Sequence, residues 1–344
     1  MSGPRPDEPM GMELAELRLL EALRAAATDV ELDVRVIGGR GGRRHARRVG
    51  ARWIPARCGS LPSLALAGSD IVHLLGLDLP PPRRKAFVAM VHDLAPLVYE
   101  DEGALPPWTG EIAERASLFL TPSEFTAGEV RRHLGVPAER VTVIGSGPAL
   151  DARLAEPLAP SELQQLSIEP PFVLRSGGYS RRKNVPLLLK AWTSVPDATL
   201  VLTGPPQPAR AQILAEAPSL DRVVVLDYVP EALQARLLRS AAALVSTSSY
   251  EGFGLPTLEA LSAGTPVVAV AAPYAREVCS DAALLVDERV DALADGLGRV
   301  IHDQQLAHLL RQRGLCRAVG FTWNRTAAAV LSAYARLSDD QGLV

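Results

Sequence analysis

Short apolar runs alternate with longer amphipathic segments along the second half of the chain. Six apolar, largely β-branched runs predict strands at 172–176, 199–204, 223–229, 243–248, 267–271 and 283–287. Most of the segments between them carry apolar residues at i, i+3 and i+4, the spacing of an amphipathic helix. Fully apolar strands separated by single helices indicate right-handed crossovers and a parallel sheet covered on both faces. This half is therefore expected to form a doubly wound α/β domain.

The first half of the chain carries the same alternation. Its apolar runs predict strands at 31–37, 70–75, 87–92, 118–121 and 141–145, with helices at 12–27, 108–116 and 123–134. These elements predict a second doubly wound domain. No strand pattern precedes Met12, and the family resemblance described below implies that the first strand of this domain is missing or degenerate.

The domain boundary is expected in residues 151–171, which are rich in proline, alanine and acids and contain no strand pattern. We therefore expect an N-terminal domain over 1–160 and a C-terminal domain over 161–322. A last helix is expected in 323–344, and one expected position for it is against the N-terminal domain. Open parallel sheets bind ligands at the carboxyl ends of their strands, so the functional site is expected at that edge.

Composition narrows the class of protein. With 344 residues, 47% hydrophobic and 22% charged, the chain is long enough to bury two cores. Its net charge of -3 does not favour nucleic acid as a partner. Cys58, Cys279 and Cys316 lack the CxxC spacing of a zinc site and are expected to be reduced thiols. No signal peptide or bilayer-spanning run is apparent, which predicts a cytoplasmic protein.

Seven arginines lie between Arg40 and Arg57, after the strand predicted at 31–37. The glycines there lack the third glycine and the following helix of a dinucleotide site, so a nicotinamide site is rejected. Two interpretations of the arginines stay open. They belong either to a solvated loop or to a patch that contacts an anionic acceptor or anionic lipid, at the inner face of a membrane.

The stretch SGGYSRRKNVPLLL, Ser176–Leu189, places three cations before a helix. Asn184 is a candidate N-cap and Pro186 belongs to the first helical turn. The cations Arg181, Arg182 and Lys183 then crowd the positive end of a helix dipole, which is unfavourable unless an anion is bound there. A diphosphate fits this site because it takes both main-chain amides and cationic side chains. The alternative is that the long side chains extend into solvent.

The stretch YEGFGLPTLEA, Tyr250–Ala260, follows the strand predicted at 243–248 and is expected at the carboxyl edge of the sheet. Pro256 fits the start of a helix and Gly264 its C-terminal cap. Gly252 and Gly254 allow the main chain to approach a ligand closely. The stretch is thus expected to be a ligand-binding loop.

Two carboxylates flank this glycine loop. Glu251 lies at its mouth, and Glu259 lies about one turn into the following helix. A carboxylate that accepts two hydroxyl hydrogen bonds is the usual means of holding a ribose or a hexose. Either acid alone could be an ordinary surface residue, but the pair around one loop favours a sugar or nucleotide site.

Several stretches together resemble glycosyltransferase family 4, which contains retaining, nucleotide-sugar-dependent enzymes of the GT-B fold. The resemblance covers roughly residues 85 to 335. It is carried by TPSEFTAGEVRRHLGVPAERVTVIGSG, GGYSRRKNVPLLLKAW, LDYVPEALQARLLRSAAALVSTSS, YEGFGLPTLEALSAGTPVVA and YAREVCSDAALLVD. It implies two doubly wound, Rossmann-like domains that face each other across a cleft.

The resemblance also implies roles for individual residues. Glu251 is expected to contact hydroxyls of the donor sugar, and Glu259 to hold the ribose. Arg182 and Lys183 are expected to neutralise the leaving diphosphate in place of a metal ion, so neither a metal nor another cofactor is implied. Contacts of the glycine loop with sugar and phosphate are expected at Gly252, Phe253, Gly254 and Leu255.

The stretch VHDLAPLVY, Val91–Tyr99, matches the histidine-aspartate motif of the same family. The match implies that His92 lies at the reacting sugar, while Asp93 is balanced between a site role and a helix cap. One departure is Gly178, where the family often has an arginine. Diphosphate neutralisation would then depend on Arg182 and Lys183.

The expected function is the retaining transfer of a hexose from a nucleoside diphosphate sugar to a hydroxyl acceptor, such as a small molecule, a glycan or a lipid-linked glycan. HDLAPL resembles mannosyl- and rhamnosyl-type members, which makes GDP-mannose the first donor to consider, with UDP- and dTDP-hexoses open. The alternative is a catalytically impaired, transferase-like partner subunit that binds a nucleotide sugar. A phosphorylase or epimerase of the same fold is a third hypothesis.

Overall fold

The structure is a computed structural model that describes residues 11–38, 46–47, 49–55, 68–83, 86–204 and 208–340. Its described residues form two compact units. The C-terminal unit comprises 148–321 with the start of the first helix, and the N-terminal unit comprises 15–147 with the chain from 322 onward. The chain thus changes unit at 14–15, 147–148 and 321–322, whereas the sequence predicts changes at 160–161 and 322–323 only.

A six-stranded, all-parallel sheet forms the centre of the C-terminal unit. Its order is β12-β11-β10-β7-β8-β9. The strands are β7 (Phe172–Ser176), β8 (Thr199–Thr203), β9 (Val223–Val225), β10 (Ala243–Ser246), β11 (Val267–Val270) and β12 (Leu284–Val286). All six predicted strands are confirmed. The direction in which successive strands are added changes between β7 and β10. From β7 the chain adds β8 and β9 on one side, and from β10 it adds β11 and β12 on the other.

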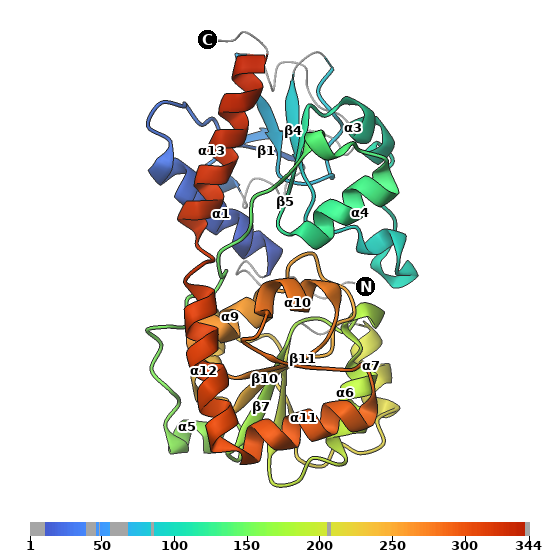
Figure 1. Cartoon of the computed structure of the whole chain (residues 1–344), viewed down its shortest axis with the longest axis vertical. Helices are drawn as coiled ribbons and strands as arrows, with labels where there is room; N and C mark the ends of the chain where they lie inside the picture. Colours follow the sequence, from blue (N-terminus) through green and yellow to red (C-terminus); the bar gives the residue numbers. More distant parts are fainter. Residues whose placement is uncertain are drawn as a thin grey trace. The chain divides into compact units, whose positions relative to one another are not determined.

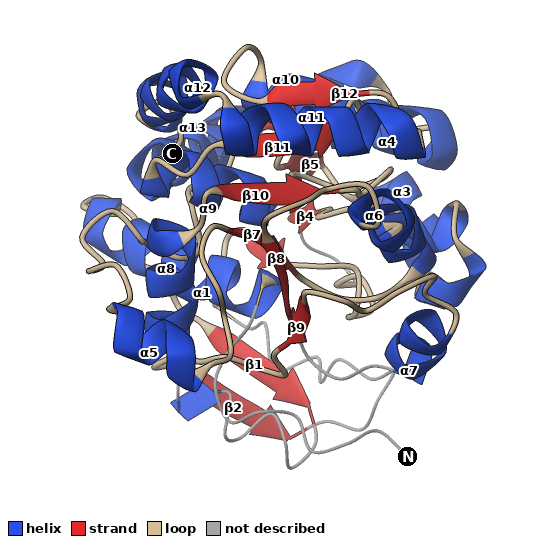
Figure 2. Ribbon diagram, turned by 90° about the horizontal axis from the view of Figure 1, so that it is seen from below, coloured by secondary structure: helices blue, strands red, loops and turns tan. Residues whose placement is uncertain are grey.

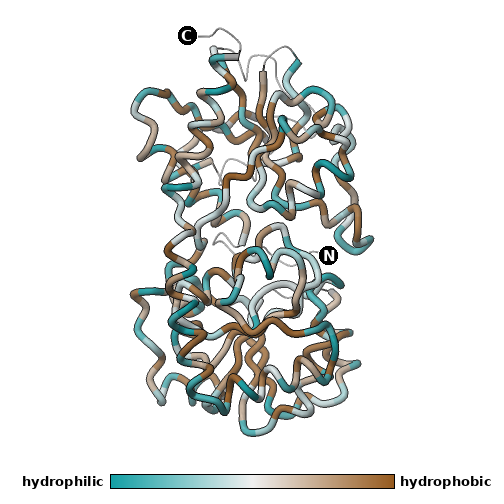
Figure 3. Tube along the Cα trace, viewed as in Figure 1, coloured by the Kyte–Doolittle hydropathy of each residue, from teal (hydrophilic) through white to brown (hydrophobic). Residues whose placement is uncertain are grey.

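Helices cover both faces of this sheet, with α6, α7 and α11 on one face and α8 and α9 on the other (Figure 2). Trp192 and Leu188 of α6 and Leu297 of α11 are fully or almost fully buried against the strands. The helices are α5 (Pro160–Gln165), α6 (Val185–Trp192), α7 (Pro208–Ala215), α8 (Glu231–Ser240), α9 (Leu255–Ala263), α10 (Pro273–Cys279), α11 (Val290–His302) and α12 (Gln304–Ala318). Because both faces are covered, the strands are apolar through most of their length (Figure 3), and the exceptions include Arg175 and Ser176 at the carboxyl end of β7.

The N-terminal unit contains a parallel four-stranded sheet in the order β3-β4-β5-β6. These strands are β3 (Val72–Leu74), β4 (Phe87–Met90), β5 (Leu118–Thr121) and β6 (Val141–Val143). Its helices include α1 (Met12–Ala26), α3 (Thr109–Arg115) and α4 (Glu124–Leu134), as the sequence predicts. A separate pair of parallel strands joins β1 (Arg35–Gly38) to β2 (Arg52–Pro55).

The last helix, α13 (Trp323–Asp340), packs on the core of the N-terminal unit. Ala327, Val330 and Ala333 of α13 are fully buried in one cluster with Leu19 of α1 and Leu120 of β5. Figure 1 shows α13 running beside α1. The N-terminal unit is therefore built from both ends of the chain.

The sequence prediction missed several elements, including β2 and α5. The strand β2 lies within the arginine-rich segment, where the arginines obscure the short apolar pair Trp53 and Ile54. The strand predicted at 31–37 pairs with β2 and does not join the four-stranded sheet. The helix α5 lies inside the segment interpreted as a linker and begins at Pro160, with the Glu162 side chain accepting from the Ala159 amide.

Candidate functional site

Two loops meet at the carboxyl edge of the sheet in the C-terminal unit, at the point where chain order reverses. One follows β7 and contains a short 3-10 turn, Arg181–Lys183, and the other follows β10. The Thr247 hydroxyl donates to the Lys183 carbonyl at 2.8 Å, and the Ser249 amide donates to the Arg182 carbonyl at 2.9 Å. These bonds fix the cationic turn beside the glycine loop, at the place where open α/β sheets bind ligands.

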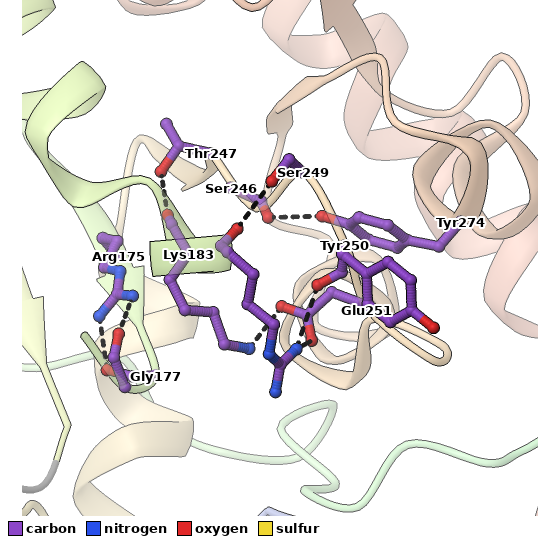
Figure 4. A network of polar contacts seen from close by, with 11 residues as sticks. Arg175, Gly177, Lys183, Ser246, Thr247, Ser249, Tyr250, Glu251 and Tyr274 are labelled. Carbon is purple, nitrogen blue, oxygen red and sulfur yellow. Dashed lines mark hydrogen bonds and ion pairs between the residues drawn. The ribbon is translucent and has the colours of Figure 1, made fainter. Parts of the chain in front are cut away.

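The carboxylate of Glu251 lies between two cations of the neighbouring turn (Figure 4). Arg182 donates to one of its oxygens at 2.7 Å and Lys183 to the other. All three side chains are only 13–14% exposed. Although burial opposes ionisation, Lys183 and Arg182 hold the pKa of Glu251 at about 2. Glu251 is therefore an anion throughout the physiological pH range.

The cluster has more positive than negative charge. Arg182 and Lys183 face a single carboxylate, and burial lowers the pKa of Lys183 despite the attraction of Glu251. A lysine ammonium has three donors and a guanidinium has five, so each cation can contact Glu251 and a further acceptor at once. The geometry is suited to an additional anion, such as a phosphate.

The glycine loop brings main-chain donors close to this cluster. Gly254 has a φ of +93° and precedes α9, and a Cβ atom at this position would lie 2.7 Å from the Tyr274 ring. Phe253 is buried and packs edge-to-face on Phe321, with ring centroids 5.7 Å apart. Within the described residues, the N–H groups of Phe253, Gly254 and Leu255 have no hydrogen-bond acceptor. Such groups at a helix N-terminus favour an anionic or hydroxyl ligand.

Both ends of α9, the helix that follows the glycine loop, lie where the sequence predicts them. Pro256 lies in the first turn of α9, and Gly264 caps its end in the left-handed conformation with a φ of +72°. Gly252 is buried at the turn that precedes Phe253. The sequence pattern thus located both ends of the helix that carries Glu259.

Glu259 differs from Glu251 in its electrostatic environment. Its carboxylate accepts a 3.3 Å hydrogen bond from the Leu150 amide, and no cation of the described chain lies within ion-pair distance. Burial raises the pKa of Glu259 to about 8, against the effect of the Leu150 amide. The two predicted acids are thus held in opposite protonation states near neutral pH.

Asn184 precedes α6 as predicted, but its side chain does not cap the helix. The residue is left-handed, with a φ of +44°, and its side-chain amide donates to Glu288 at 2.7 Å. Asn184 therefore occupies the predicted N-cap position without a side-chain hydrogen bond to the helix. The left-handed conformation arises because the 3-10 turn of Arg181–Lys183 has to reverse into α6.

His92 belongs to the N-terminal unit, directly after β4. Its Nε2 atom lies 2.9 Å from the Leu75 carbonyl oxygen and 3.3 Å from a carboxylate oxygen of Glu16. Donation from Nε2 to the Leu75 carbonyl leaves Nδ1 as the acceptor in the neutral ring. The next residue, Asp93, accepts from the Ala95 amide at 3.0 Å, which is the geometry of a turn cap.

Three residues near these groups were not selected from the sequence. Glu16 of α1 contacts His92. The hydroxyl groups of Tyr274 and Ser246 are hydrogen-bonded at 2.9 Å, with either one as the donor. Arg175 lies near the end of β7. A helical periodicity marks Glu16 only as a polar position, and Tyr274 and Arg175 are isolated polar groups in apolar elements. Only three-dimensional proximity identifies them.

Five of the seven arginines in the segment Arg40–Arg57 lie outside the described residues. Arg47 is exposed, and Arg52 is exposed in β2, 3.5 Å from Asp33. In the described part of the chain, no helix combines the length and hydropathy required to cross a bilayer. The prediction of lipid contact stays a prediction.

Two protein-family models together match most of the chain. Residues 11–151 match the model described as Glycosyltransferase Family 4, and residues 161–315 match Glycosyl transferases group 1. Among curated proteins, the chain is 31% identical over 236 residues to O-antigen chain mannosyltransferase B of Escherichia coli. That alignment covers 65% of this chain and 62% of the relative.

Another relative is the MMP alpha-(1->4)-mannosyltransferase of Mycolicibacterium hassiacum, at 28% identity over 65% of this chain and 55% of the relative. The chain thus spans less than two thirds of the length of either relative. Among solved structures, Anabaena Alr3699/HepE in complex with UDP-glucose superposes with a TM-score of 0.74 at 19% identity, over 96% of this chain and 98% of that one. The sucrose-phosphate synthase of Thermosynechococcus elongatus gives 0.73 at 21% identity, over 96% and 94%. These likenesses identify the fold as GT-B.

Proposed function

Because the chain belongs to the family 4 type of glycosyltransferases, we propose that it transfers a hexose from a nucleoside diphosphate sugar to a hydroxyl acceptor, with retention at the anomeric carbon. The observation that carries the proposal is the cluster of Arg182, Lys183 and Glu251 beside the amides of Phe253, Gly254 and Leu255. It combines donors for a diphosphate with an anion that accepts from sugar hydroxyls.

In the proposed step, the bond between the anomeric carbon and the diphosphate oxygen breaks, and its electron pair leaves with the diphosphate. Arg182, Lys183 and the loop amides stabilise the charge that develops there. The acceptor hydroxyl oxygen bonds to the same face of the sugar, and its proton passes to an oxygen of the leaving phosphate. The step does not require a general base from the protein.

Glu251 and Glu259 have separate parts in this proposal. Glu251, held ionised by its two cations, accepts hydrogen bonds from hydroxyls of the donor sugar. Glu259 binds the two ribose hydroxyls, and its high pKa in the ligand-free protein ties this contact to the loss of a proton. His92 accepts from a hydroxyl of the sugar through Nδ1, because Nε2 is engaged by Leu75.

Mannose is the hexose we propose first, and GDP the nucleotide. Both relatives described above carry the word mannosyltransferase in their names, which supports this choice. The same names support an enzyme over a catalytically impaired partner subunit. No metal or other cofactor is invoked, and contact of Arg40–Arg57 with anionic lipid is retained as a hypothesis for a lipid-linked acceptor.

The test begins with thermal shifts in GDP, UDP, dTDP and ADP, since a ligand of the folded state raises the melting temperature. The matching donor sugars are then assayed for hydrolysis and transfer, and the anomeric configuration of the product is determined by proton NMR. Glu251→Gln should abolish turnover. Glu162→Gln, which breaks the Arg236 pair at the surface of the same unit, is the control. Nucleotide binding with no turnover of any donor would contradict the proposed activity.

A further inference from the structure

Arg175 is a buried cation in an unusual place for a charge. It is the fourth residue of β7, a central strand of the sheet, and is only 3% exposed. Its neighbours along the strand, Val173 and Leu174, belong to the apolar core. Among the described residues, no carboxylate lies within ion-pair distance of its guanidinium. Burial of a charged guanidinium is unfavourable because the group loses its hydration. An arginine at this position therefore requires a partner or a function.

The partners of Arg175 are main-chain carbonyls of the next loop. Its two terminal nitrogens donate to the carbonyl oxygens of Gly177 and Gly178, and Figure 4 shows the guanidinium turned toward Gly177. The guanidinium carbon also lies 5.0 Å from the centre of the Tyr179 ring. The planar fork of an arginine can hold two acceptors in a fixed geometry, which a lysine cannot do.

This contact determines how two successive peptide groups point. In a planar trans peptide, the C=O and the following N–H lie in opposite directions. Since both carbonyls are turned toward Arg175, the amides of Gly178 and Tyr179 are turned away from it. Within the described residues the Gly178 amide has no hydrogen-bond acceptor, so it is available to an anion on that side of the loop.

Arg175 also adds charge to the cluster described above. Arg175 and Glu251 line the same small cavity, together with Ser246, Ser248 and Thr257. Glu251 favours the charged form of Arg175, while burial lowers the pKa of Arg175 to about 10. At neutral pH, therefore, the cluster contains three cations, Arg175, Arg182 and Lys183, and one carboxylate, that of Glu251. The excess of two positive charges matches a diphosphate.

We propose that Arg175 is a positioning residue of the diphosphate site, which turns the Gly177–Gly178 carbonyls inward, presents the Gly178 amide to the diphosphate and adds a buried positive charge beside Glu251. The proposal rests on the proposed function, because it assigns a residue to the same donor site. Gly178 has no side chain of its own to supply a charge at this loop. Arg175 acts by orienting the loop and by the electrostatic effect of its positive charge, and it does not contact the reacting atoms.

The test is isothermal titration of three variants with inorganic pyrophosphate, the four nucleoside diphosphates and the corresponding nucleosides. Arg175→Met removes the charge and the fork, and Arg175→Lys keeps only the charge. Arg239→Met is the matched control, because Arg239 also donates to a main-chain carbonyl, that of Ala263, in the same unit. Melting temperatures are recorded for each variant, and titrations are run well below the melting temperature of the least stable one.

The expected result is a loss of diphosphate and pyrophosphate affinity of about tenfold or more in Arg175→Met, in keeping with a lost charge-assisted interaction. Arg175→Lys should recover part of it. Affinity for the nucleoside with the same base should stay within about twofold, and Arg239→Met should change neither. The ratio of diphosphate to nucleoside affinity is the quantity that a purely structural role would leave constant.

Three outcomes overturn the proposal. They are diphosphate affinity that is unchanged in both Arg175 variants, diphosphate and nucleoside affinities that fall in parallel, and a wild-type protein that binds neither pyrophosphate nor any nucleoside diphosphate. A selective loss of diphosphate affinity without turnover of any donor by the wild type would support the role of Arg175 and contradict the proposed transfer. If Arg175→Lys or Arg175→Met turned over donor at the wild-type rate and KM, the result would support the proposed transfer and contradict the role of Arg175.

Discussion

The guanidinium of Arg182 donates a 2.7 Å hydrogen bond to the carboxylate of Glu251, although the two residues lie 69 positions apart in the chain. Against the effect of burial, Lys183 and Arg182 together hold the pKa of Glu251 at about 2, so its carboxylate is ionised at physiological pH. The bond between Arg182 and Glu251 joins the loops after β7 and β10. It gives the pair two functions, since the same contact stabilises the loop and fixes the anion that is proposed to bind the sugar.

Glu251→Gln should separate binding from transfer. The amide keeps the shape of the side chain but releases Arg182 and Lys183 from their counter-charge, so nucleoside diphosphate affinity is expected to stay the same or rise. Transfer should fall by about 100-fold or more, because the sugar loses an ionised acceptor. Steady-state kinetics and titration of the diphosphate measure the two effects. An equal loss of binding and turnover would contradict the assignment of Glu251 to the sugar.

The contributions of Lys183 and Glu251 to the free energy of unfolding should be strongly coupled. Lys183→Met alone leaves a buried carboxylate with one cation fewer, and a loss of about 3 kcal/mol in the free energy of unfolding is expected. The double variant Lys183→Met/Glu251→Gln removes both charges and should be more stable than Lys183→Met. Urea unfolding of the four proteins completes the cycle. Additive losses would mean that the two side chains do not interact in solution.

Much of this cluster could be predicted from the sequence, because its residues lie in two local motifs. The glycines and Pro256 predicted the loop and the start of α9, and the cations before Val185 predicted an anion site. The link between the loops could not be predicted, since it depends on β7 and β10 being neighbours in the sheet. The strand order is set by packing between distant segments, so Arg175 and the pairing of Lys183 with Glu251 emerged only from the structure.

Nucleotide binding should release a proton from Glu259. Its pKa is raised to about 8 in the ligand-free protein, so the carboxyl is mostly protonated at pH 7. The ribose hydroxyls are proposed to donate to the ionised form, and affinity should therefore increase from pH 7 to pH 8 and then level off. Titrations in buffers of different ionisation enthalpy measure the protons released. Glu259→Gln should eliminate the buffer dependence, and a buffer-independent enthalpy in the wild type would argue against this linkage.

The N-terminal unit should lose stability in mild acid through His73. This residue is hydrogen-bonded to Tyr334 of α13 at 2.6 Å, and burial, aided by the charge of His92, lowers its pKa to about 4. The unfolded state takes up its proton near pH 6.5, so stability falls as the pH drops from 6.5 to 4, by about 3 kcal/mol at most. Calorimetry of the wild type and His73→Phe at several pH values tests this. In His73→Phe, the free energy of unfolding should lack the part of the decrease between pH 6.5 and pH 4 that comes from His73.

Glu16 is expected to act through His92. Its carboxylate lies 3.3 Å from Nε2 of His92 and helps to fix the ring, so Glu16→Ala should lower kcat by about tenfold, as is typical when a supporting group is lost. Diphosphate affinity should be unchanged, because the cationic cluster belongs to the other unit. Glu13→Ala on the same helix is the control. A change in diphosphate affinity without a change in kcat would contradict this role.

The packing of α13 on the N-terminal unit has a consequence for biosynthesis. Since Ala327, Val330 and Ala333 complete the core around Leu19 and Leu120, that unit lacks part of its interior until the ribosome has made the last helix. The segment 148–321 is complete earlier, so the second unit of the chain can finish folding before the first. Folding of the unit formed by 15–147 therefore depends on a later segment of the chain, and its apolar surface around Leu19 and Leu120 stays uncovered until α13 has been made.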